Sequence, residues 1–79
     1  MDAVRQARMR WRSRRGLLEL DLVLDRFWAS AGAGMTEGEA AVLEALLRLP
    51  DNDLLDLVMG RSEVAEEKWQ GVVERLRAA

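Results

Sequence analysis

The feature that most constrains the fold is the spacing of large apolar residues between positions 15 and 31. At about 100° per residue these side chains fall within one narrow sector of an α-helix. They are Leu17, Leu20, Leu24, Phe27, Trp28 and Ala31. No run of alternating β-branched residues elsewhere predicts a strand. We therefore expect an all-α fold in which this helix, over residues 15–31, buries one face against other helices.

Two further helices are predicted on either side of this one. The first runs from an N-cap at Asp2 to about Arg12, and its narrow apolar stripe is expected to face the core: Val4, Ala7 and Trp11. The other opens at "TEGE", where Thr36 and Glu39 have the spacing of a capping box. It continues to Pro50 through four core residues: Val42, Leu43, Leu46 and Leu47.

The C-terminal third predicts two more helices. One starts at an N-cap on Asp51 and runs to Met59, with Gly60 as its C-terminal cap. The last starts near residues 62–64, and its core stripe is Ala65, Trp69, Val72, Val73 and Leu76. Five short helices with short connections predict a compact five-helix bundle that forms one small domain over residues 1–79.

Composition excludes most kinds of catalysis by this chain alone. Its 79 residues include no histidine, cysteine or tyrosine, so the commonest general base and the commonest metal ligand are absent. No glycine-rich phosphate loop is present. The carboxylate pairs Glu66–Glu67 and Asp51–Asp53 are interpreted as a solvated helix face and a helix start. The three tryptophans, each on an apolar stripe, are interpreted as core residues. We expect neither an enzyme nor a metal site.

The charge distribution is uneven. Residues 1–15 carry six arginines and one acidic residue, whereas residues 16–79 carry six basic and thirteen acidic residues. The chain is thus a basic N-terminal arm on an acidic body. No apolar run approaches the roughly 20 residues that span a bilayer, so no membrane insertion is expected. The arginine-rich start is poor in serine and is interpreted as part of the domain of a cytoplasmic protein.

The outward side of the helix at 15–31 breaks the usual pattern of a solvated face. Leu18 and Leu22 are predicted to lie there beside Arg15 and Glu19, next to Gly16. A glycine inside a helix costs up to about 1 kcal/mol relative to alanine. We interpret this surface as a docking site at which a partner approaches Gly16. Replacing Gly16 by alanine is then expected to raise the melting temperature and to weaken partner binding. Two alternatives are an ordinary Arg15–Glu19 ion pair and self-association through the two leucines.

The segment "RMRWRSRRGLLELD" resembles the small bacterial flavinylation factors, known in mitochondria as succinate dehydrogenase assembly factor 2. Arg15, Gly16 and Glu19 match the RGxxE motif of this family, and five flanking residues also match: Arg8, Trp11, Arg14, Leu20 and Asp21. "MTEGE" and "DNDLLDLVMG" are similar to later family segments, although Leu57 stands where many relatives carry tryptophan. The family fold is a five-helix bundle, as the periodicity predicts here.

The resemblance implies a function and a surface. Family members bind the flavoprotein subunit of succinate dehydrogenase, or in some bacteria that of fumarate reductase, and promote covalent attachment of FAD to a histidine of that subunit. Arg15, Gly16 and Glu19 are then expected to contact the partner, together with Trp11, Arg14 and Asp21. Leu18 joins these partner-binding residues because of its predicted exposed position beside Gly16. FAD belongs to the partner, and no cofactor is expected to bind this chain stably.

Two other classes of function compete with this one. The basic N-terminal arm suits a nucleic-acid-binding module, although the acidic body argues against nucleic acid as a partner. A small regulatory or antitoxin-like interaction protein is the other alternative.

Overall fold

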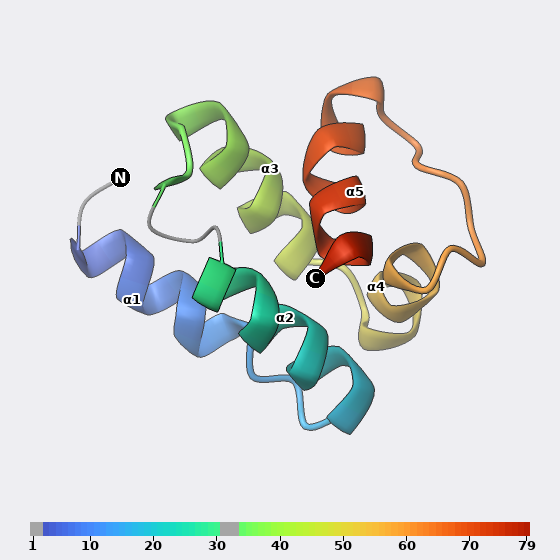
Figure 1. Ribbon diagram of the computed structural model, residues 1–79, viewed down its shortest axis with the longest axis horizontal. Coiled ribbons are helices and arrows are strands. Elements are labelled where there is room, and N and C mark those ends of the chain that lie inside the picture. The colour runs from blue at the N-terminus through green and yellow to red at the C-terminus, as the bar shows by residue number, and fades with distance from the viewer. Residues whose placement is uncertain (1–2, 31–33) are drawn as a thin grey trace.

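A computed structural model describes residues 3–30 and 34–79, which form five α-helices and no strand (Figure 1). The helices are α1 (Ala3–Arg12), α2 (Leu18–Ser30), α3 (Glu37–Leu47), α4 (Asp51–Val58) and α5 (Gln70–Ala78), and a short 3-10 helix, η2 (Glu67–Trp69), precedes α5. The predicted all-α five-helix bundle is confirmed. No helix in the described part of the chain is both long and apolar enough to cross a membrane.

The core lies where α2 packs against α4 and α5, and where α3 packs against α1 and α5. The side chains at its centre are at most 1% exposed: Met9, Leu20, Leu24, Phe27, Leu43, Leu46, Leu54, Val73 and Leu76. The apolar stripe predicted for α2 is confirmed at its four central positions, while Leu17 is partly buried. Ala31 lies outside the described residues.

The apolar stripe of α1 faces solvent and not the core, so its predicted orientation is wrong. Val4 and Trp11 are 69% and 73% exposed, and Ala7 is exposed as well, whereas Met9 is fully buried. The interpretation of Trp11 as a core residue is therefore wrong. The orientation of α1 is set by α3, because Arg5 forms ion pairs with Glu37 and Glu44 on that helix. The predicted N-cap at Asp2 lies outside the described residues.

Helix α2 begins at Leu18, three residues later than predicted. Residues 13–17 form a non-helical connection from α1, in which Gly16 has a φ of +82°. A left-handed backbone at this point is incompatible with a continuous right-handed helix. The predicted helix over 15–31 is thus wrong at its N-terminal end, and Gly16 lies in a turn.

The caps of α3 and α4 follow the sequence more closely. Thr36 and Glu39 form the predicted capping box, and the four predicted core residues of α3 are buried. Gly60 has a φ of +76° and ends α4 as predicted, because the amides of Gly60 and Arg61 bond back to carbonyls of the last turn, as in a Schellman motif. The N-cap of α4 is Pro50, so the prediction of Asp51 is wrong.

Helix α5 starts at Gln70, later than the predicted start at 62–64. Residues 61–66 are irregular, and Ala65 is exposed, so its assignment to the core is wrong. Arg77 holds this segment in place, because its guanidinium donates to the carbonyl oxygens of Leu57 and Ser62. Trp69 lies in η2 and is partly buried against the core. Val72, Val73 and Leu76 are buried as predicted.

The α3 capping box leads to a prediction about acid stability. The Glu39 carboxylate accepts a hydrogen bond from the Thr36 amide and pairs with Arg75 of α5. The hydrogen bond from the Thr36 amide, and after it the positive charge of Arg75, lower the pKa of Glu39 below its ordinary value. A lowered pKa means that the stabilisation by this carboxylate is complete above the ordinary pKa and is lost as pH falls through the folded-state pKa.

We expect the Glu39→Gln variant to lose less stability on acidification than the wild-type chain. Glutamine still caps the Thr36 amide, so the substitution isolates the carboxylate charge. Urea unfolding at neutral pH and at several acidic pH values measures the difference. Parallel stability curves for the two proteins would contradict the prediction.

Candidate functional site

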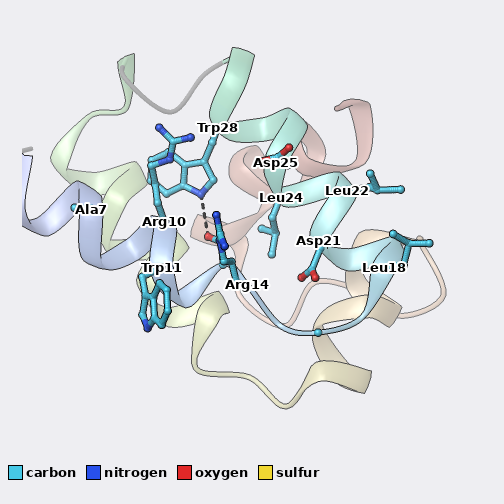
Figure 2. Close-up of a pocket in the computed structure, with 12 residues that line it drawn as sticks. Ala7, Arg10, Trp11, Arg14, Leu18, Asp21, Leu22, Leu24, Asp25 and Trp28 are labelled. Carbon is cyan, nitrogen blue, oxygen red and sulfur yellow. Dashed lines mark hydrogen bonds between the residues drawn. The ribbon is translucent and has the colours of Figure 1, made fainter.

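An open groove of about 650 Å³ lies between α2 and the C-terminal part of α1 with the connection that follows it (Figure 2). Five of the seven predicted site residues line it: Trp11, Arg14, Gly16, Leu18 and Asp21. The structure thus brings together residues from α1, the connection and α2. The remaining two, Arg15 and Glu19, lie outside its lining.

A buried hydrogen-bond chain fixes the floor of the groove. The Trp28 indole N–H donates to Ser13 Oγ over 2.9 Å, and that hydroxyl donates to the Met9 carbonyl oxygen, also over 2.9 Å. Arg10 lies over the Trp28 ring, with its guanidinium carbon 5.7 Å from the ring centroid. Trp28 belongs to α2, Met9 and Arg10 belong to α1, and Ser13 is the first residue of the connection. These contacts therefore set the distance between α1 and α2, which form the walls of the groove.

Arg15 is a structural residue in this fold. Its side chain is only 13% exposed and reaches the turn between α3 and α4. The guanidinium donates to the carbonyl oxygens of Leu47 and Leu49 over 2.7 Å each, to Asp51 Oδ1 over 2.8 Å and to the Arg12 carbonyl oxygen over 3.2 Å. The alternative of an Arg15–Glu19 ion pair is wrong, because Asp51 pairs with this arginine.

Asp21 joins the connection to α2. Its Oδ1 accepts a hydrogen bond of 2.8 Å from the Arg15 amide, while its own amide bonds to the Leu17 carbonyl oxygen. The carboxylate therefore closes the turn that contains Gly16. Arg15 and Asp21 together hold this turn at the edge of the groove.

Gly16 is required by its backbone conformation. A side chain at φ +82° is strained, whatever space surrounds it. A Cβ atom added at Gly16 would meet no described atom within 4 Å, so the position is open to the outside. The sequence-based expectation that alanine would stabilise the chain rested on a helical Gly16, and the structure reverses it.

We expect Gly16→Ala to lower the free energy of unfolding by about 1–2 kcal/mol, because alanine is disfavoured in the left-handed region. Gly16→Asn is expected to lose less, since asparagine tolerates this conformation. Gly71→Ala is the matched control. Gly71 is helical and its added Cβ also meets nothing within 4 Å, so alanine should stabilise α5 by up to about 1 kcal/mol. Urea unfolding compares them, and equal signs for Gly16→Ala and Gly71→Ala would contradict this account.

The exposed edge of the groove mixes apolar and charged groups. Leu18 and Leu22 are 75% and 44% exposed, as the sequence predicted. Glu19 lies beside them on the first turn of α2 and has no ion pair within residues 3–30 and 34–79. Arg14 is exposed on the opposite wall. An exposed leucine pair between free charges of both signs is typical of a protein-binding surface.

Sequence reasoning missed six residues of the groove: Ala7, Arg10, Ser13, Leu24, Asp25 and Trp28. Trp28 was assigned to the core, and it is indeed buried. One signal was available, since a buried indole N–H needs an acceptor. That Ser13 supplies it depends on the packing of α1 against α2, which local spacing does not encode.

The metal interpretation finds no support in the described part of the chain. No group of histidine, cysteine or carboxylate side chains there could hold a metal ion. Glu66 and Glu67 are exposed as predicted, but they lie in the irregular segment and in η2, so the predicted α-helical face is wrong. The Asp51 carboxylate forms an ion pair with Arg15.

The fold and the groove define a small all-helical protein in which five of the seven predicted partner-binding residues line one open surface. A family model described as "Flavinator of succinate dehydrogenase" (Sdh5) matches residues 7–79. The chain therefore belongs to the Sdh5 family.

Several bacterial relatives are named FAD assembly factor SdhE. The chain is 45% identical over 62 residues to the FAD assembly factor SdhE of Ralstonia nicotianae, covering 78% of this chain and just under two thirds (65%) of that protein. It is 39% identical to the protein of the same name from Legionella pneumophila, with 85% of each chain covered. For that of Aliivibrio fischeri the identity is 41%, over 95% of this chain and 87% of the relative. No solved structure shows significant similarity to the chain.

Proposed function

We propose that this chain is a flavinylation factor that binds the flavoprotein subunit of succinate dehydrogenase, or of fumarate reductase, and promotes covalent attachment of FAD to it. Family membership supports the activity. The observation that supports the surface is the groove between α1 and α2, which gathers five of the seven residues that the sequence predicts to bind the partner.

The proposed role is that of an assembly factor, not of an enzyme. The chain has no histidine or cysteine to act as nucleophile or base. Its contribution is to hold the client subunit in the arrangement in which the client's own groups react, since orientation alone lowers a barrier substantially. FAD remains a cofactor of the client.

Within this surface the residues divide into two groups. Arg15, Gly16 and Asp21 shape the turn through the contacts described above. The exposed side chains contact the client: Trp11, Arg14, Leu18, Glu19 and Leu22. A bacterial cytoplasmic location is proposed as well, since the named relatives are bacterial.

The test is covalent flavin fluorescence of the client subunit on a denaturing gel. The succinate dehydrogenase flavoprotein is expressed with and without this chain in a host that lacks its own factor. We expect a signal several-fold higher with the chain present. Equal signals in both lanes, repeated with the fumarate reductase flavoprotein, would overturn the proposed function.

A further inference from the structure

Helix α1 presents its apolar stripe to solvent instead of to its own core. Val4, Ala7 and Trp11 follow one line along the helix, and all three are exposed. Figure 2 shows Trp11 projecting from α1 away from α2. The contacts of α1 with the rest of the fold are made by Met9 and Arg5 on the other side and by Arg10, which lies over the Trp28 ring. The fold does not use this stripe, and an exposed tryptophan on it points to a partner.

Arginines border the stripe on both sides. At about 100° per residue, Arg8 and Arg12 fall on one flank of α1 and Arg10 falls on the other. All three are exposed, and none forms an ion pair within residues 3–30 and 34–79. Arg5 lies on the same flank as Arg8 and Arg12 by this spacing, and it is paired with Glu37 and Glu44 of α3. The outward face of α1 therefore carries unneutralised positive charge around an apolar centre.

The stripe is continuous with the groove of the proposed function, because Ala7, Arg10 and Trp11 also line that groove. We infer that the docking surface extends from the groove along the outward face of α1, and that the client patch covering it is acidic, with an apolar pocket for Trp11. This inference rests on the proposed function and adds the chemistry of the client surface. Tryptophan and arginine are the residues most often found to dominate such interfaces.

The structure favours a protein over the other occupants of this surface. A bilayer surface would hold α1 by one aromatic and two small aliphatic side chains, which is little apolar area for a stable interfacial helix. A second copy would have to offer its acidic end, around α4 and residues 61–67, which Figure 1 shows at the opposite end of the molecule from α1. Such head-to-tail contacts leave open ends and favour filaments over a closed pair.

The experiment measures binding of the purified chain to the immobilised flavoprotein subunit at about 0.01 M and about 0.15 M salt, between which the Debye length falls from about 30 Å to about 8 Å. We expect Trp11→Ser to raise Kd at least tenfold, mainly through faster dissociation. Arg12→Glu should slow association severalfold at low salt and reduce its salt dependence. Lys68→Glu, an exposed cation in η2 far from α1, makes the same charge change and should alter neither rate.

The outcomes separate this inference from the proposed function. If Trp11→Ser and Arg12→Glu bind like the wild-type chain while Glu19→Arg binds weakly, the inference is overturned and Trp11 is removed from the proposed contact residues, while the proposed flavinylation activity stands. If the wild-type chain itself does not bind, both the inference and the proposed function are contradicted.

Sedimentation with vesicles of phosphatidylglycerol and phosphatidylcholine tests whether a lipid surface is the partner. If Trp11→Ser and Arg12→Glu abolish vesicle binding but leave client binding unchanged, the partner of this surface is an anionic membrane and not a protein. Concentration-dependent sedimentation of the chain alone, abolished by the same variants, would assign the surface to a second copy.

Discussion

Replacing Arg15 by alanine is expected to lower the free energy of unfolding by about 2–4 kcal/mol, the largest loss we expect from any single residue of the RGxxE motif. The guanidinium makes four hydrogen bonds. Three of them join the connection at 13–17 to the turn between α3 and α4, and the fourth reaches the Arg12 carbonyl oxygen at the end of α1. Hydrogen bonds to charged groups contribute about 1.5–3 kcal/mol each, but Asp51 is partly exposed and recovers solvation when its partner is removed. A domain of this size has a net stability on the order of 4–12 kcal/mol, so the loss is a large fraction of the total.

Thermal unfolding followed by circular dichroism measures this effect, and we expect the midpoint to fall by about 10 °C or more. Arg15→Lys should restore less than half of the loss, because an ammonium cannot donate to Leu47, Leu49 and Asp51 as a planar fork does. Arg14→Ala is the matched control. Its guanidinium is exposed and has no ion pair in the described part of the chain, so its stability should stay within about 0.5 kcal/mol of wild type. Equal melting temperatures for Arg15→Ala and Arg14→Ala would contradict the structural role of Arg15.

The fold was predictable from the sequence wherever a local pattern decides the structure. The spacing of Leu20, Leu24, Phe27 and Trp28 leaves only one helical face to bury, and all four are buried. Thr36 with Glu39, and Gly60 with its positive φ, are local signals that act within a few residues of themselves. These signals need no knowledge of the rest of the fold, which is why five helices could be recognised.

The sequence-based predictions are wrong where contacts between residues far apart in the sequence determine the structure. Spacing alone identifies the apolar stripe of α1 but not the direction it faces, which depends on the ion pairs of Arg5 with α3 and on the insertion of Met9 into the core. The start of α5 was placed too early for a similar reason. Arg77 holds the carbonyl oxygens of Leu57 and Ser62, and these contacts favour an irregular segment over a longer helix.

The candidate site shows both situations in one motif. Local reasoning found the right stretch of chain, since five predicted residues meet in one groove. It interpreted Gly16 as a helical residue and Arg15 as an exposed one, because the bonds of Arg15 reach residues 32 to 36 positions away. The docking role of the site residues remains a proposal, and the structure adds a division of labour among them.

Reversing the charge of Glu19 is expected to abolish most of the flavinylation while leaving the chain folded. Glu19 lies on the first turn of α2, is exposed, and has no ion pair within the described residues. Its only contribution to the fold is a favourable interaction with the helix N-terminus, and Glu19→Arg should therefore destabilise the chain by about 1 kcal/mol or less. If this carboxylate contacts a cation of the client, an arginine in its place introduces repulsion as well as losing the contact, which costs several kcal/mol of binding.

Covalent flavin fluorescence of the client should then fall at least tenfold with Glu19→Arg, whereas the melting temperature should stay close to wild type. Asp53→Arg is the matched control, because Asp53 is also an exposed acid in the first turn of a helix, at a distance from the groove. It should have the same small effect on stability and none on flavinylation. Equal losses of fluorescence with both variants would mean that net charge, not the position of Glu19, governs the activity. A wild-type signal with Glu19→Arg would remove Glu19 from the contact surface.

This comparison and the Arg15 variants together distinguish the structural residue of the motif from the contact residue. Arg15→Ala is expected to lose activity and stability together, whereas Glu19→Arg is expected to lose activity alone.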